Sequence, residues 1–137
     1  MEIQGFWLVF NKMNIFEKLK KMELMLVDDD EWIRDSMRIF FENEGCNLVT
    51  VETAEEALKI IKKQIFDIII ADYRLPGING IKLFEHVGNS NPGLIKILIT
   101  AYMDKKVLSD SKKAGINDLI EKPFTSETIE KVLSKFL

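Results

Sequence analysis

Five polar residues at the ends of apolar runs could together perform phosphoryl-transfer chemistry. They are Asp28, Asp29, Asp72, Thr100 and Lys122. Carboxylates that lie close together repel one another, so they stay ionised only beside a cation. Mg²⁺ suits such a group, because it takes one or two carboxylates together with waters and a phosphoryl oxygen. One carboxylate could then attack phosphorus while a hydroxyl and an ammonium group hold the phosphoryl oxygens.

Asp72 is the predicted nucleophile among these residues. It follows the run Phe66–Ala71, whose centre Ile68–Ile70 shows no alternation of apolar and polar residues. A strand that is apolar on both faces is typical of a parallel sheet covered by helices on both sides. The side chain at the end of such a strand is held rigidly, as a nucleophile requires.

The hydrophobic pattern predicts five strands that alternate with five helices in one domain. The strands are expected at 24–27, 47–51, 66–71, 94–99 and 117–120, and the helices at 32–41, 53–61, 81–87, 105–114 and 126–136. Gly45 is expected to end the first helix, and Thr53 with Glu56 is expected to form a capping box. This order indicates an α/β fold with right-handed crossovers and a parallel sheet, which gathers the polar strand ends at one edge.

The composition excludes several classes of protein. The 137 residues are 47% hydrophobic and 30% charged, which is typical of one soluble globular domain. A net charge of −3 gives no indication of nucleic-acid binding. The single cysteine, Cys46, excludes an internal disulfide and the multi-cysteine zinc patterns, and it fits a cytoplasmic protein.

Residues 1–22 differ from the rest of the chain and are predicted to form a helical extension before a domain at 23–137. The apolar stretch Phe6–Phe10 is much shorter than the roughly 20 residues that cross a bilayer, so no membrane span is expected. Apolar residues recur at helical spacing from Ile15 to Met22. This amphipathic segment could pack on the domain, pair with a second copy or touch a membrane surface.

Four sequence blocks together resemble the signature of a response regulator receiver domain. They are Leu26-Val27-Asp28-Asp29, Asp72-Tyr73-Arg74-Leu75-Pro76-Gly77-Ile78-Asn79-Gly80, Ile99-Thr100-Ala101 and Glu121-Lys122-Pro123-Phe124. The resemblance extends from about residue 23 to the end of the chain. It implies a flavodoxin-like, doubly wound (βα)5 fold with five parallel strands in the order 2-1-3-4-5.

The resemblance also implies roles for individual residues around one Mg²⁺ ion. Asp72 would be the phosphoacceptor and a metal ligand, Asp29 a direct ligand and Asp28 a ligand through water. The backbone carbonyl of Arg74 would complete the set.

Thr100 would be the switch hydroxyl and Lys122 the lysine that binds the phosphoryl group, with a cis bond between Lys122 and Pro123. Gly77 or Gly80 would supply a positive φ in the loop after the acceptor.

The family's function then implies the partners. A histidine kinase or histidine phosphotransfer protein would donate the phosphoryl group, and phosphorylation would switch contacts with a downstream protein target or output domain. The domain would be a signalling module that assists its own phosphorylation and dephosphorylation, not a classical enzyme. No nucleic-acid partner is expected. A homodimer remains open, either through residues 1–22 or through the face formed by 105–114, 117–120 and 126–136.

The chain departs from the family pattern near the switch threonine. Leu119 stands where receivers usually carry a tyrosine or phenylalanine, and Tyr102 could partly replace that ring. Arg74 and Tyr102 are bulky residues at the two positions that border the phosphoryl group in the family. We therefore expect them to hinder the attacking water and to lengthen the phosphorylated lifetime.

Two alternatives stay open from the sequence. Asp28 and Asp30 after an apolar strand also resemble the nucleophile motif of haloacid-dehalogenase-like phosphatases, although that interpretation gives Asp72 no role. The second alternative is a degenerate receiver that acts only as an interaction module.

Overall fold

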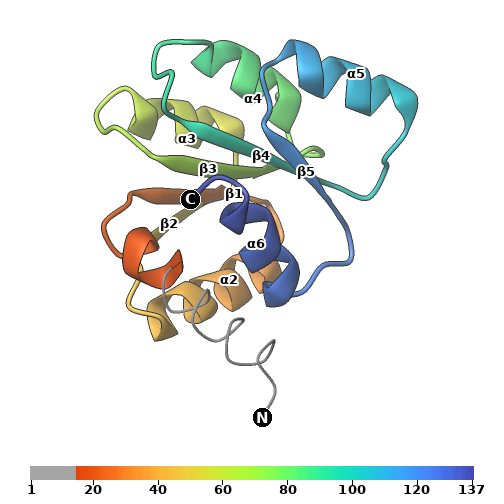
Figure 1. Ribbon diagram of the computed structural model, residues 1–137. Helices are drawn as coiled ribbons and strands as arrows, with labels where there is room; N and C mark the ends of the chain where they lie inside the picture. The colour runs from red at the N-terminus through yellow and green to blue at the C-terminus, as the bar shows by residue number, and fades with distance from the viewer. Residues whose placement is uncertain (1–14) are drawn as a thin grey trace.

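The computed structural model describes residues 15–137, and the expectations that concern Phe6–Phe10 lie outside this range. Residues 15–19 are helical, and ten labelled elements follow them (Figure 1). The strands are β1 (Leu24–Val27), β2 (Leu48–Val51), β3 (Ile68–Asp72), β4 (Ile95–Thr100) and β5 (Asp118–Glu121). The helices are α2 (Glu31–Asn43), α3 (Ala54–Ile61), α4 (Gly80–Val87), α5 (Lys105–Lys113) and α6 (Ser126–Ser134).

The sheet has the predicted topology. Its order is β2-β1-β3-β4-β5, and every neighbouring pair is parallel. Figure 1 shows α2 and α6 on one face and α3, α4 and α5 on the other. The α/β fold expected from the alternating pattern and the doubly wound order implied by the resemblance are therefore both confirmed.

The central strand β3 explains why both faces need helices. All five of its residues are buried. Ile68 and Ile70 belong to the cluster under α2 and α6, whereas Ile69 and Ala71 belong to the cluster under α3, α4 and α5. Alternate side chains of a strand point to opposite faces, so a strand of this composition needs apolar cover on both sides.

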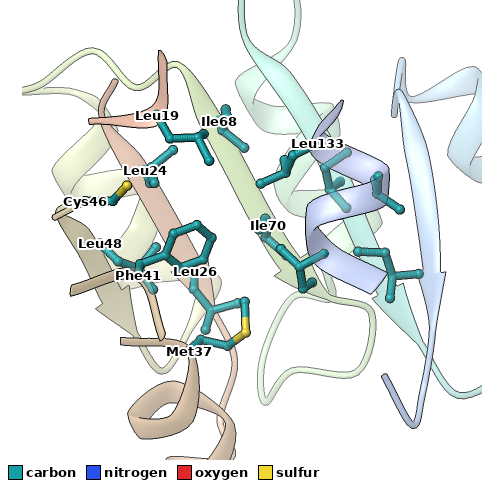
Figure 2. Packing of buried hydrophobic residues seen from close by; sticks show 14 of the residues in the cluster. Leu19, Leu24, Leu26, Met37, Phe41, Cys46, Leu48, Ile68, Ile70 and Leu133 are labelled. Carbon is teal, nitrogen blue, oxygen red and sulfur yellow. The ribbon is translucent and has the colours of Figure 1, made fainter. Parts of the chain in front are cut away.

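The helical residues 15–19 pack on the domain. Ile15, Phe16 and Leu19 are buried in the cluster under α2 and α6, and Figure 2 shows Leu19 beside Leu24 of β1. The Phe16 ring meets the Phe40 ring edge-on, with centroids 5.9 Å apart. Of the three possibilities left open by the sequence, packing on the domain is the one seen for these residues.

The helix ends follow the local sequence. The Gly45 amide donates to Glu42 O and the Cys46 amide to Phe41 O, which is a Schellman motif with Gly45 at φ +77°. The Glu56 amide donates to Thr53 Oγ1 at 3.1 Å, which is one half of the predicted capping box.

A capping box with both bonds opens α6, between Thr125 and Thr128. Sequence reasoning missed it because the expected Glu or Gln is replaced by threonine.

The last three strands each end one residue later than predicted. Asp72 and Thr100 therefore lie inside the sheet, as the final residues of β3 and β4. They still have register partners, because Asp72 lies opposite Ile99 and Thr100 lies opposite Glu121. Within residues 15–137, no helix is both long and apolar enough to span a bilayer.

Candidate functional site

The carboxyl ends of β1, β3 and β5 bring four charged side chains together. The register pairs Val27 with Ala71, so Asp28 and Asp72 each lie one position further along neighbouring parallel strands. Lys122 Nζ lies 3.1 Å from Asp72 Oδ2 and 3.6 Å from Asp28 Oδ2. Asp28, Asp29 and Asp72 each offer a carboxylate oxygen, and these three oxygens lie within 4.8 Å of one another.

Burial makes this cluster electrostatically unusual. Asp28 is 0% and Asp72 6% exposed, whereas Asp29 is exposed. Burial raises the pKa of Asp28 to about 6, helped by the negative charge of Asp72 and opposed by the Asp30 amide. Burial also raises the pKa of Asp72, against the opposing effect of Lys122. Burial lowers the pKa of the Lys122 ammonium, but the two carboxylates outweigh it and the net pKa is raised.

Asp28 is fixed by its own backbone neighbourhood. Its Oδ1 accepts from the Asp30 amide at 2.9 Å, and its carbonyl accepts from Arg34 Nη1 at 2.9 Å. Among the described residues, Asp28 Oδ2 has no hydrogen-bond donor, and its nearest cation is the Lys122 ammonium at 3.6 Å. A buried carboxylate oxygen without a donor beside two further carboxylates fits a hard divalent cation such as Mg²⁺.

Thr100 lies at the same edge but faces a different partner. Its side chain is buried, with 1% of the residue exposed. The hydroxyl donates to Tyr102 O at 3.2 Å and accepts from the Tyr102 amide at 3.0 Å. The structure thus brings the Thr100 backbone to the sheet edge while its hydroxyl binds the loop after β4.

The two bulky residues singled out from the sequence contact each other. Arg74 lies in the loop after β3, and its Cζ is 4.3 Å from the centroid of the Tyr102 ring. A guanidinium at this distance makes a cation–π interaction with the ring. The pair joins the loop after β3 to the loop after β4.

The loop after Asp72 needs two glycines for different reasons. Gly77 has φ +78°, so Gly77 supplies the expected positive φ. Gly80 does not; instead, a Cβ on Gly80 would overlap the backbone carbonyl oxygen of Asp72. Glu55, which the sequence did not single out, accepts from the Ile78 amide at 3.2 Å and holds this loop. Its place in the first turn of α3 indicates only a favourable charge at a helix N-terminus, so no sequence signal pointed to the loop.

Asp30 lies outside the carboxylate cluster. It is the N-cap of α2, where Oδ1 accepts from the Trp32 and Ile33 amides at 2.9 and 3.4 Å. The phosphatase alternative needs Asp30 at the reaction centre, and this capping role leaves it elsewhere. The Lys122–Pro123 bond is cis, as the resemblance implied.

Comparison with known proteins agrees with this fold. The family model described as the response regulator receiver domain matches residues 24–134. The chemotaxis protein CheY-3 of Vibrio cholerae is 30% identical over 121 residues, which cover 85% of this chain and 92% of that protein. A cyclic di-GMP phosphodiesterase of Thermotoga maritima is 29% identical over 108 residues. These residues cover 79% of this chain but only 29% of that protein's length.

Solved structures give the same result. A CheY-like receiver domain protein from Methanospirillum hungatei superposes with a TM-score of 0.78 and 32% identity, covering 84% of this chain and 93% of that one. The response regulator TrrA of Thermotoga maritima, solved in complex with Mg(2+)-BeF, has a TM-score of 0.74 and 28% identity, covering 85% and 99%.

The fold and the matched family model together define a receiver domain of the two-component signalling class. The chain belongs to the family of response regulator receiver domains, whose members are signalling domains. Receivers of this family bind Mg²⁺ at an acidic pocket and act together with histidine kinases and output domains.

Proposed function

We propose that Asp72 accepts a phosphoryl group from the phosphohistidine of a histidine kinase or histidine phosphotransfer protein. The phosphorylated domain then changes its contacts with a downstream protein or output domain. The observation that carries the proposal is the position of Lys122 Nζ, 3.1 Å from Asp72 and 3.6 Å from Asp28 within a cluster of three carboxylates.

The transfer itself is a simple displacement at phosphorus. A carboxylate oxygen of Asp72 attacks the phosphorus while the bond from phosphorus to the donor imidazole nitrogen breaks. The imidazole keeps the electron pair of that bond and takes up a proton from water. The product is an acyl phosphate on Asp72.

The chain's own side chains stabilise the transferred group. The Lys122 ammonium, which bonds Asp72 Oδ2 before transfer, neutralises one phosphoryl oxygen afterwards. Thr100 turns its hydroxyl from Tyr102 towards a second phosphoryl oxygen and donates to it. These two side chains also hold the group while it is hydrolysed, so the domain assists both its phosphorylation and its dephosphorylation.

Asp28, Asp29, Asp72 and the backbone carbonyl of Arg74 would hold the Mg²⁺ ion, Asp29 directly and Asp28 through water. When bound, the ion would supply positive charge that offsets the repulsion among the carboxylates and the negative charge of the phosphoryl group. The donor-free Asp28 Oδ2 and the shared position of the three carboxylates support this assignment.

Intact-mass spectrometry with a small acyl phosphate donor and Mg²⁺ tests the proposal. Wild type should gain one phosphoryl group and Asp72→Ala none. Asp30→Asn is the matched control, because asparagine also caps helices and Asp30 lies outside the cluster. Sizing the same samples before and after the reaction tests whether phosphorylation forms a homodimer.

Two results would contradict the proposal. A gain of mass that persists in Asp72→Ala but disappears in Asp28→Asn would favour the phosphatase-type nucleophile. No gain in wild type, together with no Mg²⁺ binding in the millimolar range, would favour a degenerate receiver.

A further inference from the structure

The contact between Arg74 and Tyr102 bridges two loops that border the acidic cluster. Arg74 comes two residues after Asp72, and Tyr102 comes two residues after Thr100. The guanidinium Cζ lies 4.3 Å from the ring centroid, although Arg74 is exposed and Tyr102 is 49% exposed. Both side chains are therefore held by each other at the surface and not by burial in the core.

We propose that Arg74 and Tyr102 form a latch that is closed in the unphosphorylated protein and opens when Asp72 is phosphorylated. In the closed state, Thr100 holds the Tyr102 backbone and Arg74 holds the Tyr102 ring. In the open state, both holding groups turn to the phosphoryl group and Tyr102 is released. The opening step rests on the proposed phosphorylation of Asp72, whereas the closed state does not.

The first half of the latch is the Thr100 hydroxyl. It makes two hydrogen bonds with Tyr102, donating to the carbonyl at 3.2 Å and accepting from the amide at 3.0 Å. A hydroxyl has a single proton, so it cannot donate to the Tyr102 carbonyl and to a phosphoryl oxygen at the same time. Rotation of Thr100 about χ1 also carries the oxygen away from the Tyr102 amide. Binding of the phosphoryl group by Thr100 thus frees the Tyr102 backbone.

The second half of the latch is the Arg74 guanidinium. The Arg74 backbone amide donates a hydrogen bond to the Asp72 carboxylate, so Arg74 belongs to the loop that receives the new charge. A phosphoryl group on Asp72 adds a charge of about −1.5 to −2 and three strong acceptor oxygens there. A charge-assisted bond to such an oxygen is stronger than a cation–π contact at an exposed site. Arg74 therefore leaves the ring when the charge arrives, and both contacts that hold Tyr102 are lost in the same event.

Because Leu119 replaces the aromatic residue usual in the family, another side chain has to report the state of Thr100 in this chain. Leu119 is half-buried in the apolar cluster under α3, α4 and α5, and it has no ring or hydroxyl that could report the state of Thr100. Tyr102 is coupled directly to Thr100 and stands just before α5, which begins at Lys105. Release of Tyr102 would change the surface at the start of α5, where Met103 is also exposed.

Fluorine NMR can follow the latch, because the chain has only two tyrosines. In a Tyr73→Phe variant labelled with 3-fluorotyrosine, the single resonance comes from position 102. In the unphosphorylated protein, the chemical shift of this resonance should depend on Arg74, so adding Arg74→Gln should change it. Arg74→Lys, which keeps the positive charge but not the planar guanidinium, is the matched control and should shift it less.

Phosphorylation is the second arm of the experiment, with an acyl phosphate, Mg²⁺ and occupancy measured by intact mass. The Tyr102 resonance should move in proportion to occupancy, towards its position in Arg74→Gln. In Thr100→Val at matched occupancy, this movement should fall to less than about half, because the hydroxyl that couples Tyr102 to the phosphoryl group is missing.

The outcomes separate the latch from the proposed function. If Arg74→Gln leaves the chemical shift of the Tyr102 resonance unchanged, the closed latch is contradicted, whether or not Asp72 is phosphorylated. Full occupancy without movement contradicts the opening step and leaves Asp72 as the phosphoacceptor. If wild type gains no mass, both the proposed function and the opening step are contradicted. The closed state is then still tested by the effect of Arg74→Gln on the unphosphorylated protein.

Discussion

Helix α5 is anchored by smaller buried side chains than α2 and α6 on the opposite face of the sheet. The face under α2 and α6 buries large apolar side chains, among them Phe16, Leu19 and Phe41. On the other face, α5 buries only Val107 and Ser111 of its nine residues. The acidic cluster stands at the carboxyl ends of β1, β3 and β5, whereas Thr100 and Tyr102 lead into α5. We conclude that α5, the helix that follows Thr100 and Tyr102, is held by less buried apolar side chain than α2 and α6.

The composition of α5 explains this difference. Two of its nine residues are apolar, Val107 and Leu108, and Leu108 is exposed. Four lysines occupy its first and last turns: Lys105, Lys106, Lys112 and Lys113. Since most of a helix's stability in a protein comes from packing of its apolar face, α5 is expected to shift at low cost.

Core truncation on the two faces should give the largest contrast. Phe41→Ala should lower the free energy of unfolding by about 3–5 kcal/mol, because it leaves a large cavity under α2. Val107→Ala should cost about 1.5 kcal/mol for two lost methyl-sized groups. Urea denaturation of both variants measures the difference, and equal losses would contradict the weak anchoring of α5.

The pH dependence of the metal-free protein tests the cost of the buried carboxylates. The pKa of Asp28 is raised to about 6, above the value of about 3.9 for an unperturbed aspartate. The folded state therefore binds the proton more tightly than the unfolded state. The stabilisation is fully present below about pH 4 and is lost as the pH rises through 6.

The free energy of unfolding in EDTA should fall by about 3 kcal/mol across this window from Asp28 alone, and the raised pKa of Asp72 acts in the same direction. Asp28→Asn removes the titrating group and should flatten the dependence. A wild-type curve that rises between pH 4 and 6.5, or one that Asp28→Asn leaves unchanged, would contradict this account of the cluster.

Removing an unsatisfied buried oxygen from α5 should change the free energy of unfolding by less, and should raise it. Among the described residues, the buried Ser111 Oγ has no hydrogen-bond partner. Ser111→Ala removes this unsatisfied oxygen and improves helix propensity, so it should raise the free energy of unfolding by about 1 kcal/mol. Ser134→Ala is the control, because Ser134 is exposed at the end of α6 and its hydroxyl already donates to Glu130 O at 2.6 Å. A loss of stability in Ser111→Ala would show that α5 is held better than its contacts indicate.

The lifetime of the phosphorylated protein should change least. From their positions in the sequence, Arg74 and Tyr102 are expected to hinder the attacking water, and in the proposed open latch Arg74 still binds the phosphoryl group. The double variant Arg74→Ala, Tyr102→Ala should therefore admit the attacking water more easily. We expect dephosphorylation to become about threefold faster, equivalent to about 0.7 kcal/mol of barrier. The time course after removal of the donor measures it, and an unchanged half-life would refute the hindrance expected from the sequence.

The fold was largely predictable because the chemistry of the strands is local. Uninterrupted apolar runs such as Ile68–Ile70 indicate both the strand and its burial, and the alternation with helices indicates a parallel sheet, whereas the strand order came only from the family resemblance. The grouping of Asp28, Asp72 and Lys122 followed from the parallel arrangement, since parallel strands end at one edge.

Contacts that depend on side-chain direction could not be predicted in the same way. Glu55 holds the loop at Ile78 and Arg34 holds the Asp28 carbonyl, yet both have the residue type of ordinary surface charges. The Tyr102 ring under Arg74 likewise depends on the geometry of two loops that no periodicity describes.

The central claim is that Asp72 carries the phosphoryl group, and locating that group tests it most directly. Wild type is treated with the small acyl phosphate donor and Mg²⁺. The acyl phosphate formed on the protein is then trapped by reduction, and the digested peptides are sequenced by mass spectrometry. The modification should lie on the peptide that contains Asp72 and at that residue. Modification at Asp28 or Asp29 with an unmodified Asp72 would contradict the account.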